Sequence, residues 1–296
     1  MSSPKYDTHP EAWHGIDPAD FEVKIKGLTR DYTFFHLTDL HMGELTPDEA
    51  TEMPDERRAY ARRRFEDFSR EGQGAAALWN DYMSRAKAEG ADLLLLTGDI
   101  IDFPSDANVK ILKDGIQSSG IPTLYVVGNH DWSFADDYHT PIAEALHRPK
   151  FAEICYGDPC ISWVEYEDLI VCAVDDSRDR VVKDTVDKFF SLYEKGKPII
   201  LMMHVPLHVD SMEADTRACW QGRNLTMGGI AGFYGDDPHV KRFYEAVALD
   251  PDTPVKLVVT GHLHFHHEDI LPNGIPQIVT DKGYTGGCRV IRVGRE

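Results

Sequence analysis

The stretch KLVVTGHLHFHHEDI, residues 256–270, places four histidines directly after an apolar run that ends at a glycine. The apolar residues 257–259 predict a buried strand, and Gly261 predicts its end. The four histidines are His262, His264, His266 and His267. Histidine binds metals and carries protons, but it is also an ordinary polar residue. The role of this cluster therefore depends on whether other strand ends supply matching partners.

Four further runs have the same form, a short apolar segment that ends at polar residues. They are TFFHLTD (33–39), ADLLLLTGD (91–99), IPTLYVVGN (121–129) and KPIILMMHV (197–205). Continuous rather than alternating runs predict strands that are covered on both faces. Helical patterns lie between several of them, at 55–68, 74–90, 108–120 and 182–196. Strands and helices that alternate in this way predict an α/β chain with mixed sheets.

Two other regions predict antiparallel strands. Residues 161–176, ISWVEYEDLIVCAVDD, predict a hairpin that turns near Glu167 and Asp168. Residues 268–293 predict a terminal meander with a turn at Asn273 and Gly274.

No repeat or low-complexity linker divides the chain, so we expect one domain over residues 1–296. Within it we expect a core at about 30–293, an N-terminal extension at 1–29 and a helical insertion at about 54–90. The glycine-rich stretch 205–239 directly follows a strand end and predicts a lid or binding loop.

The composition limits the partners of the protein. The chain of 296 residues has 31 basic and 50 acidic residues, a formal charge of −19, so we expect neither nucleic acid nor a membrane as partner. Five cysteines without a CxxC pair indicate neither a disulfide framework nor a cysteine zinc site. The N-terminus lacks a signal-peptide pattern, which favours a cytoplasmic location. The sequence leaves the oligomeric state open.

Each of the five apolar runs ends in side chains that can bind a metal. In chain order these are Asp39 and His41, Asp99 with Asp102, Asn129 with His130, His204, and His262 with His264. Ligand sites in open α/β sheets gather at the carboxyl ends of the strands, so we expect these ends to converge. Glycines before Asp99, Asn129 and His262 would permit the tight turns that this requires.

The number of these side chains suits two divalent metal ions. Two ions that share one carboxylate need three to four protein ligands each. Asp99 is placed to bridge them through its two oxygens. Asp39, His41 and one histidine of the last motif would complete one site, and Asn129, His204 and the other histidine would complete the second. Mixed oxygen and imidazole ligands favour Mn, Fe, Zn or Co.

The ordered motifs DxH, GDxxD, GNHD, a lone His and GHxH resemble those of the calcineurin-like metallophosphoesterase superfamily, over about residues 30–293. The resemblance implies a four-layer αββα sandwich, with two mixed central β-sheets flanked by helices. It assigns the side chains to two metals and an acid. Asp39, His41, Asp99 and His264 would bind one metal, Asp99, Asn129, His204 and His262 would bind the other, and His130, oriented by Asp102, would be the acid.

The implied function is a dimetal-dependent hydrolase of phosphate esters. A hydroxide between the metals would attack phosphorus, while His130 protonates the leaving group. Asp102 stands where purple acid phosphatases have Tyr, and Phe103 stands where Ser/Thr protein phosphatases have Arg. We therefore expect a small-molecule phosphodiesterase, similar to the bacterial cyclic-nucleotide or glycerophosphodiester branch. A phosphomonoesterase and a noncatalytic metal-binding scaffold remain as alternatives.

Other conspicuous residues have less specific interpretations. We expect His36 to be a hydrogen-bonded core histidine, Asp131 to bond the loop of His130, and His266 and His267 to be no ligands. The arginine run 57–64 predicts a solvated helix face with acidic neighbours, because its arginines mostly fall off the apolar stripe. Residues of the 205–239 stretch are candidates for the lining of the substrate pocket, namely Trp220, Arg223 and Phe233.

Overall fold

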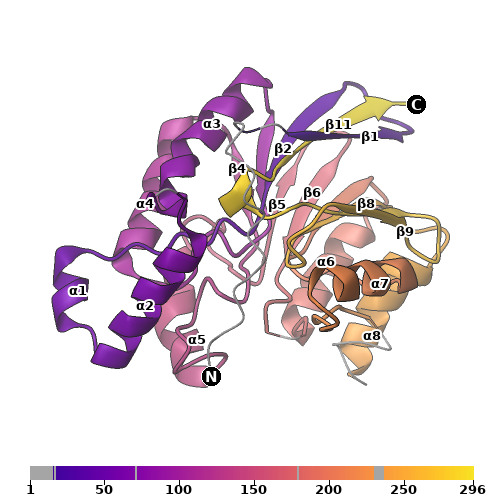
Figure 1. Cartoon of the computed structure of the whole chain (residues 1–296). Helices are drawn as coiled ribbons and strands as arrows, with labels where there is room; N and C mark the ends of the chain where they lie inside the picture. The colour runs from indigo at the N-terminus through magenta and orange to yellow at the C-terminus, as the bar shows by residue number, and fades with distance from the viewer. Residues whose placement is uncertain (1–15, 17, 71, 179, 230–236) are drawn as a thin grey trace.

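The computed structural model describes residues 16, 18–70, 72–178, 180–229 and 237–296, which form two β-sheets with helices on their outer faces (Figure 1). In this part of the chain the first sheet has five strands, in the order β1-β11-β2-β3-β4. Strands β2, β3 and β4 are parallel, whereas β11 pairs antiparallel with β2 and parallel with β1. The strands are β1 (Ala19–Ile25), β2 (Tyr32–Leu37), β3 (Leu93–Leu96), β4 (Thr123–Tyr125) and β11 (Arg289–Arg295).

The second sheet has six strands among the same residues, in the order β5-β6-β7-β8-β10-β9. Its central strands β6, β7, β8 and β10 are parallel, and β5 and β9 pair antiparallel at the two edges. The strands are β5 (Ile161–Glu165), β6 (Ile170–Val174), β7 (Ile199–Met202), β8 (Val255–Thr260), β9 (His267–Ile270) and β10 (Pro276–Val279).

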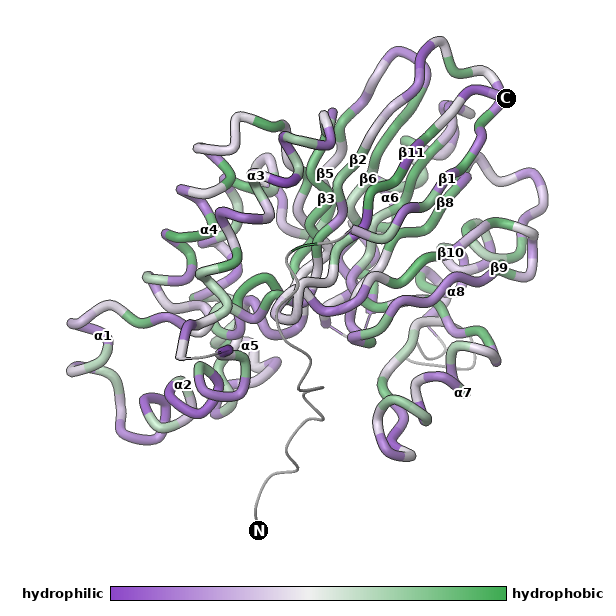
Figure 2. The backbone as a smooth tube through the Cα atoms, turned by 45° about the horizontal axis from the view of Figure 1, so that its top comes forward, coloured by the Kyte–Doolittle hydropathy of each residue, from purple (hydrophilic) through white to green (hydrophobic). Residues whose placement is uncertain are grey.

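The apolar runs are continuous because each central strand is buried on both of its faces. In β3, Leu93 and Leu95 pack between the two sheets, while Leu94 and Leu96 pack under the helices of the first sheet. All four leucines are fully buried, and each such burial stabilises the fold by about 1.5–3 kcal/mol. The hydropathy colouring shows the same pattern, with apolar segments along the central strands (Figure 2).

Helices cover the outer face of each sheet. α3 and α4 pack on the five-stranded sheet, and α6 and α8 pack on the six-stranded sheet, which gives the predicted αββα layers. The helices are α1 (Pro47–Glu52), α2 (Asp55–Phe68), α3 (Trp79–Ala88), α4 (Asp106–Ser119), α5 (Pro141–His147), α6 (Lys183–Tyr193), α7 (Asp210–Cys219) and α8 (Pro238–Tyr244), with short turns η1 (Ala75–Leu78), η2 (Arg148–Phe151), η3 (Glu245–Leu249) and η4 (Gly283–Thr285).

The five predicted strands and the hairpin formed by β5 and β6 are confirmed. The terminal meander was wrong in its last strand. β9 and β10 do form a hairpin around Asn273 and Gly274, but β11 leaves their sheet and joins β1 and β2 in the other one. Local turn chemistry predicts the hairpin, whereas the partner of β11 is set by tertiary packing.

The N-terminal extension, the helical insertion and the glycine-rich stretch all contain regular structure. Residues 1–15 and 17 of the expected N-terminal extension lie outside the described residues, and its Ala19–Ile25 segment is strand β1. The stretch 54–90 contains α2, η1 and α3. The stretch 205–239 contains α7 and the first turn of α8, and its residues 230–236 lie outside the described part.

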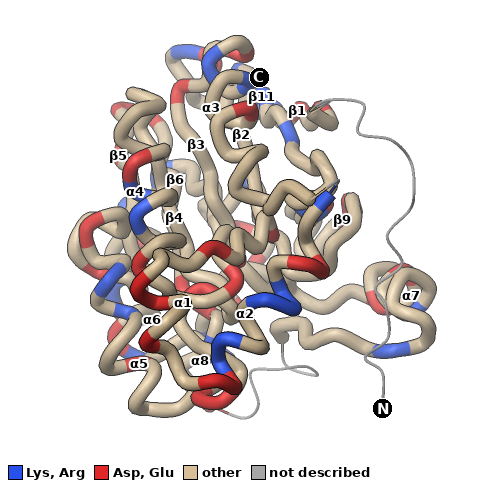
Figure 3. The backbone as a smooth tube through the Cα atoms, turned by 60° about the vertical axis from the view of Figure 1, so that its left-hand side comes forward, with Lys and Arg blue, Asp and Glu red and all other residues tan. Residues whose placement is uncertain are grey.

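Charged residues of both signs are interspersed on the outer helices and loops (Figure 3). None of the helices described here is both long enough and apolar enough to cross a bilayer.

Candidate dinuclear metal centre

The loops that follow β2 and β3 in the first sheet meet the loops that follow β7 and β8 in the second. The backbone N–H of His262 donates to Asp39 Oδ2 across a distance of 2.8 Å. His204 Nδ1 lies 2.7 Å from the carbonyl oxygen of Thr97. β2 is parallel to β3 and β7 is parallel to β8, and the two cross-sheet contacts bring the carboxyl ends of all four strands to one edge of the sandwich.

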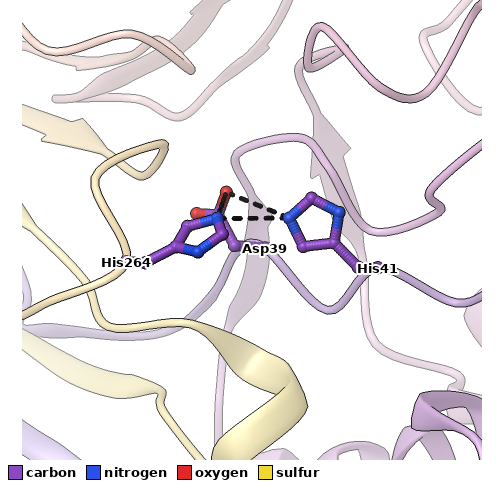
Figure 4. A group of neighbouring side chains, drawn as sticks. All are labelled: Asp39, His41 and His264. Carbon is purple, nitrogen blue, oxygen red and sulfur yellow. Dashed lines mark hydrogen bonds and ion pairs between the residues drawn. The ribbon is translucent and has the colours of Figure 1, made fainter. Parts of the chain in front are cut away.

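The first group of converging atoms belongs to Asp39, His41 and His264 (Figure 4). His264 Nε2 lies 3.2 Å from both Asp39 Oδ1 and His41 Nε2. His41 Nδ1 lies 2.8 Å from a carboxylate oxygen of Asp102, so this nitrogen carries the proton and Nε2 presents a lone pair. Asp39 Oδ1 is buried and accepts no hydrogen bond. Two ring nitrogens and one orphaned carboxylate oxygen thus face a common point.

The second group surrounds His204 Nε2. This atom lies 3.0 Å from Asn129 Oδ1, 3.3 Å from His262 Nδ1 and 3.4 Å from Asp99 Oδ2. Because His204 Nδ1 must donate its proton to the Thr97 carbonyl, Nε2 faces two oxygen acceptors. Such a cluster of acceptors is stable only with a proton or a cation among them.

Asp99 lies between the two groups, and one of its oxygens faces both. Oδ2 is 3.9 Å from His41 Nε2 and 3.4 Å from His204 Nε2. Oδ1 instead accepts the backbone N–H of His130 at 2.8 Å. Oδ2 is thus the oxygen that lies between the two groups, whereas Oδ1 also holds the backbone of His130.

Because these acidic and imidazole groups lie close together, they shift one another's pKa values in the metal-free protein. Burial opposes the charged form of Asp39, but His264 and His204 lower its pKa to about 2. Burial also opposes protonation of His204, but Asp99 and Asp39 raise its pKa to about 10. His204 therefore holds a proton at the place where the atoms of its group converge. A cation would replace this proton.

The donor set fits two divalent cations. The first group offers two imidazole nitrogens and carboxylate oxygens, and the second adds an amide oxygen, the mixture that Mn, Fe, Zn and Co accept. An orphaned atom supports the fit, because Asp39 Oδ1 is buried without a hydrogen bond. A third cluster of His41, Asp102 and His130 is a poor cation site, since Arg64 occupies both oxygens of Asp102.

His130 and Asp102 lie beside the first group. His130 Nδ1 is 3.4 Å from Asp102 Oδ1, and the imidazole is about a quarter exposed, at 26%. Asp102 is fully buried and its Oδ1 is also the partner of His41 Nδ1. The predicted contact between His130 and Asp102 is present, but the shorter contact of Asp102 is with His41.

Arg64 is the residue that sequence reasoning misjudged. Its Nε donates to Asp102 Oδ2 at 2.7 Å and its Nη2 to Asp102 Oδ1 at 2.6 Å. With 8% of its surface exposed, Arg64 does not belong to a solvated helix face, so that prediction was wrong for it. Arg58, on the same helix, pairs with Asp55 at the exposed surface, as predicted.

The backbone at the site adopts an unusual conformation. Eight of the described non-glycine residues have positive φ, and five of them are Asp39, His41, Asp99, His262 and His264, with φ between 50° and 70°. A left-handed conformation is unfavourable for residues that have a Cβ atom, and it is found at functional sites where the surrounding structure imposes it.

The three glycines of the motifs serve two purposes. Gly98 has a φ of +84°, the turn that the sequence predicts. At Gly128 and Gly261 the requirement is space. A Cβ at Gly128 would lie 2.2 Å from Asp99 Oδ1, and a Cβ at Gly261 would lie 1.9 Å from Thr38 Oγ1. Close approach of the loops after β3 and β4 explains Gly128, and close approach of the two sheets explains Gly261.

Two buried aspartates hold the loops of the site. Asp131 accepts the backbone N–H groups of Gly128 and Asp99 at 2.6 and 3.0 Å, which confirms its predicted bond to its own loop. Asp176 accepts the N–H of His204 at 3.1 Å and was not predicted. A signal for Asp176 exists, because it follows β6 as the other ligand candidates follow their strands.

The remaining histidines have ordinary partners. His36 bonds Thr280 and Thr97 at 2.7 Å each, as expected of a core histidine. His266 contacts Arg289 at 3.1 Å, and His267 lies between two aspartates of α7 and β9. Neither histidine belongs to a candidate metal group among the residues described.

Trp220 contacts a histidine of the candidate metal centre, whereas Arg223 contacts Trp220. Trp220 Nε1 donates to the carbonyl of Leu263 at 2.9 Å, and its ring centroid lies 5.3 Å from that of His264. Arg223 is exposed and its guanidinium lies 5.2 Å from the Trp220 ring. Phe233 lies outside the described residues.

An αββα sandwich that gathers these motifs at one edge defines the metallophosphoesterase class. The sequence profile of the calcineurin-like phosphoesterases matches residues 32–266, and the chain belongs to this family.

Two curated cyanobacterial relatives share part of the sequence. The 3',5'-cyclic-nucleotide phosphodiesterase of Nostoc sp. PCC 7120 is 24% identical over 173 residues, which are 58% of this chain and 56% of that protein. A probable cyclic nucleotide phosphodiesterase of Synechococcus sp. ATCC 27144 is 27% identical over 196 residues, 64% of this chain and 63% of that protein. The chain thus matches less than two thirds of the length of either relative.

Solved structures share the fold. A dimetal phosphatase from Danio rerio superposes with a TM-score of 0.53 at 11% identity, covering 86% of this chain and 88% of that one. The purple acid phosphatase PPD1 of yellow lupin gives 0.50 at 14% identity, covering 89% and 45%.

Proposed function

We propose that the protein is a dimetal-dependent hydrolase of phosphate esters, and that its substrates are small-molecule phosphodiesters. The observation that carries the proposal is the position of Asp99 Oδ2, which lies 3.9 Å from His41 Nε2 and 3.4 Å from His204 Nε2. A carboxylate oxygen that lies between two clusters of metal-binding side chains has the position that a bridging metal ligand needs.

Seven side chains would hold the metals. Asp39, His41, Asp99 and His264 would bind one ion, and Asp99, Asn129, His204 and His262 would bind the other. Divalent cations at these positions would neutralise the charge of a phosphate ester and lower the pKa of a water molecule. The bound cations would also make the pocket positive within a chain of charge −19, so that an anionic substrate is not excluded.

His130 would protonate the leaving oxygen. Its backbone N–H is held by Asp99 and its Nδ1 lies 3.4 Å from Asp102 Oδ1, so Nε2 would be the nitrogen that donates. Burial lowers the pKa of His130 to about 4, against the raising effect of Asp99 and Asp102. The carboxylates of Asp99 and Asp102 are thus the groups that favour the protonated ring which an acid needs.

The preference for diesters has two supports. Both curated relatives carry the name of cyclic nucleotide phosphodiesterases. The chain also lacks the Tyr and Arg that the resemblance associates with two phosphatase branches, since Asp102 and Phe103 stand at those positions.

The test is the ratio of hydrolysis rates for bis-p-nitrophenyl phosphate and p-nitrophenyl phosphate, with Mn(II) supplied. A strong preference for the diester would support the proposal and direct the search to cyclic nucleotides and glycerophosphodiesters. A strong preference for the monoester would replace the proposal by a phosphomonoesterase of small metabolites. A metal content near zero after purification without chelator, with neither ester hydrolysed, would favour a noncatalytic scaffold.

A further inference from the structure

Helix α2 sends two arginines to the candidate site. Arg57 and Arg64 are seven residues apart, two turns of the helix, and therefore project from the same side. They reach two different loops, the one after β3 and the one after β4.

Arg64 fixes the carboxylate that two histidines share. The fork of Arg64 holds both oxygens of Asp102, at 2.7 and 2.6 Å, in a buried and charge-assisted pair. Asp102 Oδ1 also lies 2.8 Å from His41 Nδ1 and 3.4 Å from His130 Nδ1. The position of a single oxygen thus bears on both a candidate metal ligand and the candidate acid.

Arg57 holds the loop that carries the acid. Its Nε donates to both oxygens of Asp136, at 2.8 and 2.9 Å, and its Nη2 donates to Asp137 at 2.8 Å. Its guanidinium lies 4.5 Å from the ring centroid of Phe134. These three residues follow His130 in the chain by four to seven positions.

We propose that α2 is a positioning element of the site, and that Arg64 sets Asp102 so that His41 and His130 keep their orientation. Only the activity readout of this proposal rests on the proposed function. Without Arg64, the buried Asp102 loses both charged donors and is free to turn away from the histidines. Losing an outer partner of a metal-binding histidine costs about 10–100-fold in metal affinity or activity.

The experiment compares Arg64→Gln and Arg64→Lys with Arg58→Gln, a matched control on the same helix that pairs with the exposed Asp55 and donates to carbonyl oxygens at the end of α1, away from the candidate ligands. Calorimetry measures Mn(II) binding to the metal-free chains. We expect about tenfold weaker binding to one site in Arg64→Gln, partial recovery in Arg64→Lys, and the wild-type value in Arg58→Gln. A second readout is kcat for diesters with basic and with activated leaving groups, where we expect Arg64→Gln to affect the basic ones more.

Three results overturn the proposal or separate it from the function. A folded Arg64→Gln with wild-type Mn(II) affinity and wild-type leaving-group dependence refutes it. A lower melting temperature with both of these unchanged refutes it too, because Arg64 would then only stabilise the fold. If the wild-type chain binds Mn(II) but hydrolyses no phosphate ester, the proposed function fails, and the affinities alone decide the role of Arg64.

Discussion

Replacing Asp99 by Asn removes the shared ligand with little change in shape. The amide can still accept the backbone N–H of His130 through its oxygen, which Asp99 Oδ1 accepts at 2.8 Å. Its NH₂ group then stands where Oδ2 faces His41 and His204. An NH₂ group offers no lone pair to a cation, so each metal would lose one ligand and the site would lose one negative charge.

The size of the effect follows from the number of ligands. Four-ligand zinc sites bind with about 10–16 kcal/mol, so one ligand carries about 3 kcal/mol, or roughly a 100-fold change in affinity. We expect a loss of this size at both sites of Asp99→Asn. Titration calorimetry of the metal-free chain with Mn(II), together with elemental analysis of the purified protein, measures it.

The matched control is Asp114→Asn, which removes the same charge from the exposed partner of Lys110 and should keep both metals. If Asp99→Asn lost one metal and bound the other with wild-type affinity, the bridging role would be refuted. Loss of both metals in the control as well would show that net charge rather than Asp99 governs binding.

Four further predictions test other parts of the site. His130→Asn should keep both metals but slow the cleavage of diesters with basic leaving groups by about 10²–10⁴-fold, and steady-state rates that equal those of the wild type would remove His130 from the acid role. The pKa of about 10 for His204 means that a cation must displace its proton, so Mn(II) affinity should rise between pH 6.5 and 8.5, with proton release visible by calorimetry in different buffers. The same proton stabilises the metal-free fold fully below the unfolded value of about 6.5, and that stability is lost as pH rises through 10, so the melting temperature of the metal-free chain should fall over this range. Gly261→Ala would place a Cβ 2.5 Å from Asp39 Oδ2 and should weaken metal binding, whereas Gly294→Ala, whose Cβ would lie 3.9 Å from Lys24 Cγ, should leave the Mn(II) titration unchanged.

The sequence was sufficient for the parts of the site that depend on strand ends. A buried strand needs apolar residues on both faces, and its ligands follow it directly, so both signals are contiguous in the chain. This is why Asp39, Asp99 and His262 could be placed at one edge without a structure. Their left-handed backbones have no such signal, because φ at these positions goes with hydrogen bonds to residues far away in the chain, as between Asp39 and Gly98 or His262 and Asp39.

Arg64 shows where pattern reasoning stops. In the run ERRAYARRRF most of the five arginines fall off the apolar stripe, and the solvated-face prediction was extended to all of them. Arg64 stands three residues after Ala61 and four before Phe68, which is the buried side of α2, so helical spacing alone distinguishes it from the others. What the buried side contacts is set by tertiary packing, and that is the loop containing Asp102, 38 residues further along the chain.

The strand that the sequence misplaced is also the strand that completes the site. From β10 the chain crosses to the other sheet, where Arg289 of β11 pairs with His36 of β2 (Figure 1). On this path the N–H of Gly283 donates to the carbonyl of Thr38 at 2.9 Å, and Tyr284 packs beside His264, its hydroxyl 3.5 Å from Nδ1. A meander would have kept these residues on the second sheet and left the loop of Asp39 uncovered. The crossover therefore ties the two sheets together at the point where each supplies ligands, which a pairing of neighbours in sequence could not achieve.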